Sequence, residues 1–326
     1  MKMHPNGSRL GSPCPHGDVR PNRGALRAHR KAALIVNPQA CQRQGAQLLP
    51  SLEQGLHRRG IRCDIHRPRS AAEARAVIER LDSGAGDTIV AVGGDGTNYQ
   101  LLNTLLRAGE ERPLPPLGVI PAGRGNSFAR DLGLRTVDDG LDALVGGRLQ
   151  PVDVCRFTQP DGPHYFVNLM GLGFVTDVAA TAARLPWLGD ASYAVGVFFR
   201  MLGLRFHQLV LDIDGRRIEA ANCFVEICNS RYTGGAMCMA PDALLDDGRF
   251  DVVLLAPLSR LKLVTSFPKI YNGTHGQLKE VAFMRARTLR VATRPAKTLL
   301  PDGEVFGTTP TRVDILPRRV QYFRLP

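Results

Sequence analysis

The sequence lacks any hydrophobic run long enough to cross a membrane, since no segment reaches the roughly 18 uncharged residues that a spanning helix needs. No apolar segment near the N-terminus has the form of a signal peptide. The seven cysteines are scattered, form no CxxC pair and have no histidine pair at metal-ligand spacing. We therefore expect reduced cysteines, a cytoplasmic location and, at most, peripheral association with a membrane.

Acidic residues are scarce relative to basic ones, at 30 Asp and Glu against 42 Lys and Arg, which gives a net charge of +12. Such a charge favours anionic partners, among them nucleotide phosphates, an acidic membrane surface and nucleic acid. About half of the excess lies in the first 31 residues, where seven Lys and Arg stand against one Asp. We expect residues 1–30 to be a disordered basic tail, and nucleic acid is not an expected partner of the remaining chain.

The 326 residues, 44% of them hydrophobic, are enough for about two domains with a sizeable core. In residues 31–150 short apolar runs alternate with segments of helical periodicity, which predicts an α/β domain with a doubly wound, mostly parallel sheet. The expected strands are 32–36, 61–66, 88–92 and 118–120, and the expected helices are 44–59, 70–81 and 97–107.

After residue 150 the pattern changes to extended segments separated by turn signals, which predicts a β-rich antiparallel sandwich domain over residues 151–326, whose last strand could return to the first domain. A helix is expected over 191–204, and the apolar stretch around it, with Trp187 and Phe198, would form core or gate an acyl chain. The expected extended segments are 165–170, 208–213, 221–228, 250–255, 288–292 and 311–316.

The clearest chemical signal is Gly93-Gly94-Asp95-Gly96-Thr97, which follows a buried strand and opens a helix. Glycines there let backbone N–H groups approach a phosphate at the positive end of a helix dipole. A carboxylate in such a turn would repel phosphate unless it holds magnesium or accepts a proton. The segment is neither a P-loop nor a GxGxxG turn. A tight turn with a solvated Asp95 is the alternative interpretation.

The pentapeptide resembles a signature shared by diacylglycerol kinases, sphingoid-base kinases, NAD kinases and phosphofructokinases. A second segment, 118–131, reads GVIPAGRGNSFARD and resembles the one that follows this signature in lipid kinases of the diacylglycerol and sphingosine type. It again reads as strand, glycine turn and helix, which would add N–H donors at the same sheet edge, with Asn126 able to cap the helix. The implied fold is an N-terminal domain like those of NAD kinase and diacylglycerol kinase.

The resemblance implies an ATP-dependent kinase that phosphorylates a lipid hydroxyl, with ATP and Mg²⁺ as cofactors. ATP would lie at the two glycine turns and at the end of the first strand. The implied nucleotide-binding residues are Asn37, Gly93, Gly94, Asp95, Gly96, Thr97, Gly123, Arg124 and Asn126.

A third stretch, 229–252, resembles the bacterial lipid-kinase pattern in which a glycine pair precedes Pro-Asp-Ala and Asp-Asp-Gly. By that resemblance, Asp247 and the backbone carbonyls of Leu244 and Arg249 would hold a structural magnesium ion. A hairpin turn with surface aspartates is the alternative. A fourth motif, Asp302-Gly303-Glu304, matches the Asp-Gly-Glu of lipid kinases, which implies that Glu304 is a catalytic acid/base or metal-network residue with Asp302 as its partner; a plain turn is the alternative. Asp95, together with Glu304, is the residue expected to orient or deprotonate the lipid hydroxyl.

Fewer residues of the sequence bear on the identity of the lipid substrate than on the nucleotide site. Because the third stretch resembles bacterial lipid kinases, we expect diacylglycerol as the first candidate substrate and a sphingoid base or ceramide as the second. The segment around Asp177 resembles a sphingosine-kinase segment whose Asp meets the lipid's amino group, although a helix N-terminal Asp is also favoured by the helix dipole alone. The expected partners are ATP and a lipid at a membrane surface, and a homodimer is one assembly to consider.

Several positions depart from the family pattern. Ala40 and Cys41 replace a Ser-Gly pair, Tyr99 and Gln100 replace an Asn-Glu pair, and Arg124 replaces a small Ser or Thr. An Arg at that place could bind phosphate through two hydrogen bonds or block the usual pose. Two alternatives therefore stay open: a kinase of a soluble substrate, as in NAD kinase, and a nucleotide-binding regulator with impaired catalysis.

Overall fold

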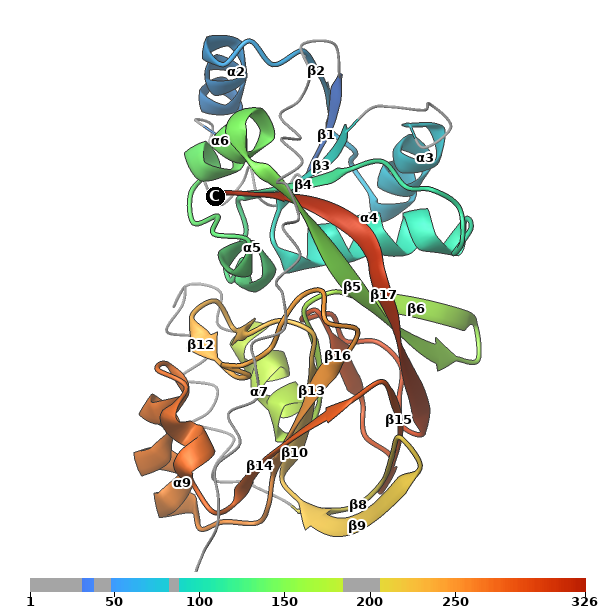
Figure 1. Ribbon diagram of the computed structural model, residues 1–326, viewed down its shortest axis with the longest axis vertical. Coiled ribbons are helices and arrows are strands. Elements are labelled where there is room, and N and C mark those ends of the chain that lie inside the picture. The colour runs from blue at the N-terminus through green and yellow to red at the C-terminus, as the bar shows by residue number, and fades with distance from the viewer. Residues whose placement is uncertain (1–30, 38–47, 82–87, 184–205) are drawn as a thin grey trace, which may run out of the picture.

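The computed structural model describes residues 31–37, 48–81, 88–183 and 206–326. Four parallel strands form the sheet of the first domain in the order β2-β1-β3-β4 (Figure 1). Three of the strands are short, apolar and fully buried, as expected where helices cover both faces, whereas β2 at the edge of the sheet is only partly buried. The strands are β1 (Ala32–Val36), β2 (Cys63–His66), β3 (Thr88–Gly93) and β4 (Leu117–Pro121).

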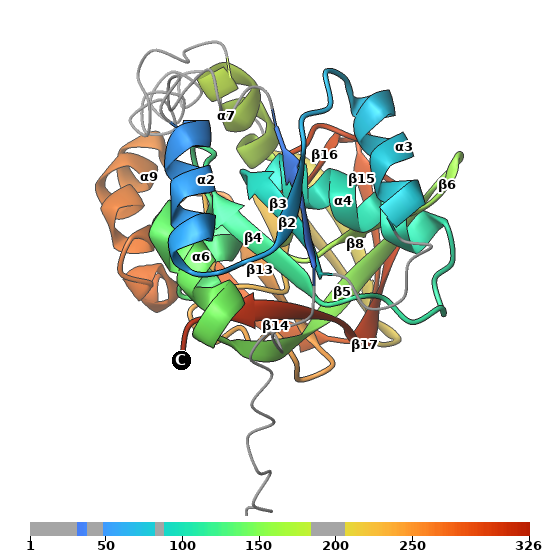
Figure 2. The same cartoon turned by 90° about the horizontal axis from the view of Figure 1, so that it is seen from above.

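Helices cover both faces of this sheet. In Figure 2, α2 and α6 lie on one side of the strands, and α3 and α4 lie on the other. The arrangement is that of a doubly wound α/β domain, as the alternation of strands and helices predicted. The helices are α2 (Leu48–Arg58), α3 (Ala71–Leu81), α4 (Asp95–Arg107), α5 (Ser127–Asp131) and α6 (Val137–Gly146).

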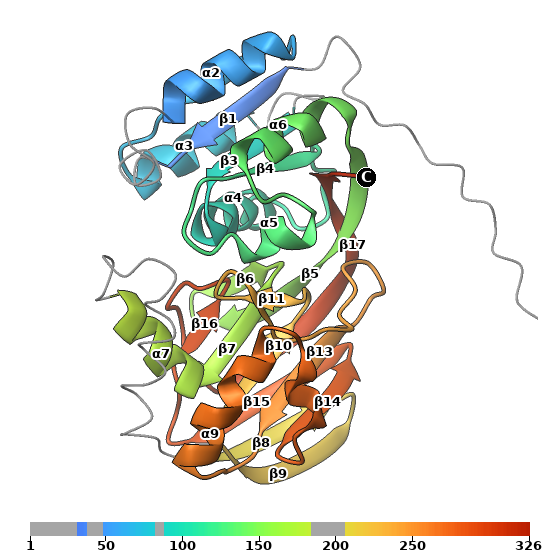
Figure 3. The ribbon, with the colours of Figure 1, turned by 90° about the vertical axis from the view of Figure 1, so that its left-hand side faces the viewer.

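The second domain is an antiparallel β sandwich whose two sheets share an apolar core (Figure 3). One layer continues the sheet of the first domain and contains β5 (Arg148–Gln159), β6 (Gly162–Phe166), β8 (His207–Ile213), β9 (Arg216–Asn222), β15 (Thr288–Arg294) and β17 (Thr311–Arg324). The other layer has the order β14-β13-β10-β7-β16 and contains β7 (Leu169–Gly173), β10 (Phe224–Cys228), β13 (Phe250–Leu255), β14 (Val281–Ala286) and β16 (Leu299–Pro301).

Short elements cover the outer face of the five-stranded layer and reach toward the first domain. The ribbon β11 (Tyr232–Thr233) and β12 (Met237–Cys238) approaches α5. The helical elements are α7 (Phe174–Ala183), α9 (Arg260–Ser266) and the 3-10 turns η2 (Phe267–Ile270) and η3 (Thr274–Gln277). Among the described residues, no helix combines the length and the apolarity that a bilayer crossing requires.

The last strand joins the two domains. β17 pairs with β5 along most of its length, and its Tyr322 pairs in parallel with Leu117 of β4. The Tyr322 hydroxyl donates to Oδ1 of Asn98 on α4 at 2.9 Å. A register shift between Leu316 and Val320 bends β17 as it passes from the sandwich to the parallel sheet (Figure 1).

Each of two segments that were expected to form one strand contains parts of two strands, and these two strands lie in different layers. The chain leaves β9 and enters β10 at Cys223, whose N–H donates to Leu255 of β13. Likewise, the expected segment 165–170 spans the end of β6 and the start of β7. A continuous apolar run does not reveal such a crossing, because both layers bury the same residue types. The expected basic tail, the start of the helix expected from residue 44 and the helix expected over 191–204 lie outside the described residues.

Candidate active site

The two glycine turns touch at the carboxyl ends of β3 and β4. A Cβ added to Gly94 would lie 3.1 Å from Cα of Gly123, and one added to Gly123 would overlap Gly94. A Cβ at Gly93 would overlap the side chain of Thr97. Glycine at these positions is therefore a packing requirement, and it keeps the backbone of both turns accessible at one edge of the sheet.

The first turn offers N–H groups that have no backbone partner in the part of the chain that the structure describes. α4 begins at Asp95, and its first hydrogen bonds run from Thr97 and Asn98 to the carbonyl of Gly94. No backbone hydrogen bond within the described residues uses the N–H groups of Gly94, Asp95 or Gly96. Unpaired donors at the positive end of a 13-residue helix are suited to bind a phosphate.

Asn37 supports this turn from the neighbouring strand. Its side-chain amide donates to Oγ1 of Thr97 at 2.9 Å, and Thr97 is buried. Asn37, Gly93 and Thr97 thus lie together at one edge of the sheet. The departures at Ala40 and Cys41 lie outside the described residues.

Asp95 crosses from the first turn to the second. Its carboxylate accepts hydrogen bonds from the N–H groups of Ser127 at 3.0 Å and Phe128 at 3.1 Å, which are the first two residues of α5. Burial raises the pKa of Asp95, and these donors act in the opposite direction. The carboxylate therefore caps α5, and it occupies N–H groups that the sequence had suggested as a second set of phosphate donors.

The expectation that Asn126 caps α5 is wrong. Asn126 stands at the N-cap position in a left-handed conformation with φ 51°, but its side chain makes no capping bond. Instead its amide accepts from the Gly123 N–H and donates to the Gly123 carbonyl, both at 3.0 Å. Asn126 therefore stabilises the glycine turn, and a residue 31 positions earlier in the chain, Asp95, caps the helix.

Arg124 lies half-buried in the second turn, between Gly123 and Gly125. Its guanidinium forms no ion pair with any described residue. The Gly123 N–H is taken by Asn126, so it is not a donor for an anion in this turn. Whether Arg124 binds phosphate or blocks the usual pose stays a prediction.

Asp302 is a buried carboxylate held by the backbone. It accepts hydrogen bonds from the N–H groups of Val167, Asn168 and Leu169, at 2.9 to 3.2 Å, while its own N–H donates to the Leu169 carbonyl. Burial raises its pKa to about 8, and the charge of Asp95 acts in the same direction. Asp302 is only 3% exposed, so it anchors the Asp-Gly-Glu turn to the start of β7.

Glu304 is the carboxylate that faces the nucleotide side. A Cβ added to Gly96 would overlap its Oε1, so the side chain rests against the first glycine turn. Desolvation raises its pKa, and the carboxylate has no hydrogen-bond or ion-pair partner among the described residues. The second domain thereby delivers an unpaired carboxylate to the helix end where the N–H groups of α4 are unpaired.

Tyr99 lies beside this cluster, at a position where the family pattern has Asn. Its side chain is buried, and its hydroxyl has no partner among the described residues. Burial, followed by the charges of Asp302 and Glu304, raises the pKa of Tyr99 far above its usual value. Tyr99 therefore places a neutral hydrogen-bond donor close to two carboxyl groups, whereas Gln100 next to it is exposed.

The third stretch packs directly on the second glycine segment. The Gly235 N–H donates to Oγ of Ser127 at 2.9 Å, and Arg231 binds Asp131 through its backbone N–H and its guanidinium. A Cβ at Gly235 would lie 3.2 Å from the Gly125 carbonyl oxygen, and its φ of 93° also favours glycine. These contacts close the site from the sandwich side, and sequence reasoning missed Ser127, Asp131 and Arg231.

The residues expected to hold a structural magnesium ion are arranged differently. Oδ1 of Asp247 accepts from the Arg249 N–H at 2.9 Å, and Oδ2 forms an ion pair with Arg285. The Leu244 side chain is exposed. An arginine therefore neutralises the carboxylate of this set in the structure, and the magnesium site that the resemblance implied stays a prediction. Over the described ranges, no three acidic, His or Cys side chains gather as a metal site.

Asp177 lies in the first turn of α7 and is exposed. A carboxylate in the first turn of a helix is stabilised by the helix dipole, and an exposed carboxylate can also meet the amino group of a lipid. The following apolar stretch, including Trp187 and Phe198, lies outside the described residues. No hydrogen bond among the described residues joins Asp177 to Asp95 or to Glu304.

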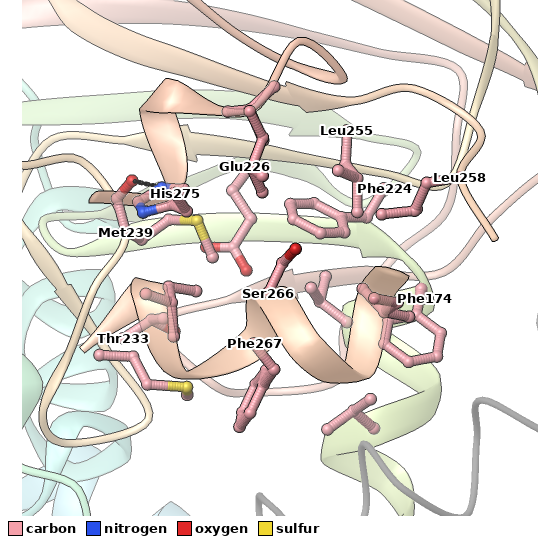
Figure 4. A pocket seen from close by; sticks show the side chains of 17 residues that line it. Phe174, Phe224, Glu226, Thr233, Met239, Leu255, Leu258, Ser266, Phe267 and His275 are labelled. Carbon is pink, nitrogen blue, oxygen red and sulfur yellow. Dashed lines mark hydrogen bonds between the residues drawn. The ribbon is translucent and has the colours of Figure 1, made fainter. Parts of the chain in front are cut away.

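An apolar pocket lies between the outer face of the five-stranded layer and the helical elements α7, α9, η2 and η3 (Figure 4). It encloses about 680 Å³ of space free of protein atoms, part of which is solvent at its mouth. Phe174, Leu258 and Phe267 are among its walls, and Thr233, next to the glycine pair, also lines it. The pocket therefore extends from the third stretch along the outer face of the sandwich domain.

Comparison with known proteins agrees with this geometry. Residues 31–157 match the family described as the diacylglycerol kinase catalytic domain, and residues 169–324 match the YegS C-terminal NAD kinase beta sandwich-like domain. The chain is 29% identical over 308 residues to a diacylglycerol kinase of Mycobacterium tuberculosis, covering 92% of this chain and 98% of the relative. It is 28% identical over 277 residues to a probable lipid kinase YegS-like of Xanthomonas euvesicatoria, covering 82% and 88%.

Solved structures show the same fold. A diacylglycerol kinase from Bacillus anthracis superposes with a TM-score of 0.68 at 20% identity, over 91% of this chain and 97% of that one. The two domains and the joined glycine turns define a lipid kinase of the diacylglycerol kinase type. This chain belongs to that family, in its bacterial branch with the YegS-like sandwich domain.

Proposed function

We propose that the protein transfers the γ-phosphate of ATP to a hydroxyl group of a membrane lipid, with diacylglycerol as the first candidate and a sphingoid base or ceramide as the second. The observation that carries the proposal is the contact of Glu304 with Gly96. It sets a carboxylate against the N–H groups at the start of α4, and neither has a partner within the described residues.

In the proposed reaction, the N–H groups of Gly94, Asp95 and Gly96 hold the phosphates, and Arg124 adds a positive charge. Glu304 orients the lipid hydroxyl and takes its proton while the oxygen attacks the γ-phosphorus and the bond to the bridging oxygen of ADP breaks. The raised pKa of Glu304 suits a group that accepts and later returns a proton.

Asp95 has a different part in this scheme. Because it caps α5, its main contribution is to hold the two glycine turns in register, and each oxygen keeps a lone pair for other contacts. Mg²⁺ bound with ATP would neutralise phosphate charge, and Asp95 and Glu304 are the carboxylates at the turns that could coordinate it. Asp302 acts as a positioning residue for Glu304.

The apolar pocket supports a lipid substrate over a soluble one, because its walls suit a hydrocarbon chain. Leu261 and Val264 on α9 are exposed by 74% and 41%, beside residues of the same helix that line the pocket. We propose that this helix rests on the bilayer surface while a lipid chain enters, which would make the membrane association peripheral. The net positive charge supports the same contact with anionic lipids.

The test is transfer of radiolabelled phosphate from ATP to mixed micelles that carry diacylglycerol, ceramide or sphingosine one at a time. We expect one lipid to be phosphorylated, and Glu304→Gln to lower kcat by about 10²- to 10⁴-fold with little change in ATP binding. Glu219→Gln is the matched control, since Glu219 is exposed on β9. Transfer to NAD alone would establish the soluble-substrate alternative, and ATP binding without transfer to any acceptor would establish the regulator.

A further inference from the structure

One charged residue interrupts an otherwise apolar strand. On β10, Val225 and Ile227 face the core between the two sheets, so Phe224, Glu226 and Cys228 face the opposite side, where the helices lie. Glu226 thus projects into the apolar pocket (Figure 4). Its cross-strand neighbours are Gly171 on β7 and Val253 on β13, neither of which offers a polar side chain.

Glu226 is buried without a partner. The side chain is 3% exposed, and Oε2 has no hydrogen-bond partner in the described part of the chain. A buried carboxyl that makes no hydrogen bond costs stability, so a chain that needed only to fold would gain from an apolar residue here. Oε1 lies 3.6 Å from where a Cβ of Gly171 would stand, so the carboxyl packs over the backbone of β7.

Two further polar groups line the same pocket. The Ser266 hydroxyl projects into it from the end of α9, as Figure 4 shows. His275 on η3 bonds the Met239 carbonyl through Nε2 at 3.0 Å, so Nε2 carries the proton and Nδ1 is an acceptor without a partner among the described residues. The pocket is therefore a hydrocarbon site with a small polar group set in its wall.

We propose that this pocket binds an aliphatic chain that carries a hydroxyl group, and that Glu226 recognises that hydroxyl and so determines which lipid the enzyme selects. The inference rests on the proposed lipid-kinase function and deepens it by naming the substrate class. A plain hydrocarbon chain would leave Glu226 unpaired, whereas a chain hydroxyl would satisfy it.

A hydroxyl suits the site because both groups stay neutral. Burial raises the pKa of Glu226 to about 8, so at neutral pH the carboxyl can donate one hydrogen bond and accept another. Burial also lowers the pKa of His275, which keeps the imidazole uncharged. A hydroxyl likewise donates and accepts, and it enters such a pocket without the large desolvation cost of an ammonium or carboxylate.

The test measures binding without catalysis. The intact protein is loaded with a fluorescent fatty acid, which is then displaced by stearate or by a series of hydroxystearates that differ in the position of the hydroxyl. We expect at least one hydroxystearate to bind about 10-fold more tightly than stearate, the loss associated with leaving one buried polar group unpaired. Glu226→Gln retains a donor and an acceptor and should keep most of this preference, whereas Glu226→Met should abolish it.

Glu219→Met is the control, because it makes the same chemical change at an exposed site on β9. Equal binding of stearate and every hydroxystearate by the wild type would overturn the inference, as would an unchanged preference in Glu226→Met. Failure of all chains to displace the probe would exclude the pocket as a chain site. A preference without phosphate transfer to any lipid would leave this inference standing and contradict the proposed kinase function instead.

Discussion

The carboxylate of Glu304 rests on Gly96, although 208 residues separate them in the chain and they belong to different domains. Gly96 is the second residue of α4, so its missing side chain is what allows the contact. The late Asp-Gly-Glu motif and the early glycine motif are thus two halves of one surface. This contact makes the position of Glu304 sensitive to a single methyl group.

Gly96→Ala should separate activity from stability. The backbone at Gly96 is helical, so Ala should leave the free energy of unfolding unchanged or raise it by about 0.5 to 1 kcal/mol. The new methyl group would displace the Glu304 carboxylate, and we expect kcat to fall by about 10- to 100-fold. Thermal unfolding and initial rates measure the two effects. Gly146→Ala at the end of α6 meets no atoms within 4 Å and should leave kcat unchanged; full activity in Gly96→Ala would contradict the placement of Glu304.

Asp95→Asn should lower stability as well as activity. An Asn side chain can accept from only one of the Ser127 and Phe128 N–H groups and would present its own N–H₂ to the other, at a cost of about 1 to 3 kcal/mol. Denaturant unfolding measures this cost, and the phosphotransfer assay should show a large loss. Asp139→Asn is a control, because Asp139 also accepts two backbone N–H groups, but both on Oδ2 in the capping box of α6, so Asn can keep them and kcat should not change. An Asp95→Asn protein of wild-type stability would rule out the capping role.

Asp302→Asn isolates the anchoring carboxylate. Asp302 has φ 46°, a left-handed conformation that Asn also tolerates, so the backbone of the turn should survive the change. Asn keeps one acceptor oxygen for the N–H groups of Asn168 and Leu169 but would present its N–H₂ to the N–H of Val167, which should lower the free energy of unfolding by about 1 to 3 kcal/mol. Urea titration measures the loss. If the Asp302→Asn protein unfolds at the same urea concentration as the wild type, these hydrogen bonds contribute little to stability.

The pH dependence of stability should report on Glu226. Its pKa is about 8 in the folded protein and 4.5 as the ordinary value, so between these pH values the folded state binds more protons than the unfolded state. Stability is therefore lost as pH rises through this window, by up to about 5 kcal/mol at 1.36 kcal/mol per pKa unit. Glu226→Gln removes this contribution while Asp302 and His275 remain.

The measurement is the difference in free energy of unfolding between wild type and Glu226→Gln at pH 5 and pH 8. We expect the difference to shift in favour of the variant at the higher pH. A difference that stays constant across this range would mean that the Glu226 carboxyl is not buried in the folded protein.

The glycine turns could be predicted because they depend on residue type. The backbones of Gly94 and Gly123 are in contact, and a side chain at Gly123 would overlap Gly94. The contact therefore requires glycine, and this requirement is visible in the sequence. The roles of Asp95 and Asn126 could not be predicted in the same way. Both side chains can cap a helix, and only the folding of β3 beside β4 decides that Asp95 reaches α5 while Asn126 turns back to Gly123.

Glu226 left a signal that sequence reasoning did not use. A charged residue within Phe224-Val225-Glu226-Ile227-Cys228 contradicts the apolar pattern of a buried strand, and such a contradiction often marks a functional position. The polar residues of β5, in contrast, concealed a strand. This 12-residue strand includes Arg148, Asp153 and Arg156, and it was not among the expected strands because these polar residues interrupt the apolar pattern.

The course of β17 has a consequence for how the chain reaches its native state. The strand supplies the edge partner of β4 and also the central partner of β5 and β15, so both domains stay open along one side until residues 311–324 are in place. Contacts between residues this far apart in sequence form late and slow the folding reaction. The two halves are therefore expected to fold as one cooperative unit, and a ribosome-bound chain that has not yet exposed β17 would carry an unpaired β4 edge.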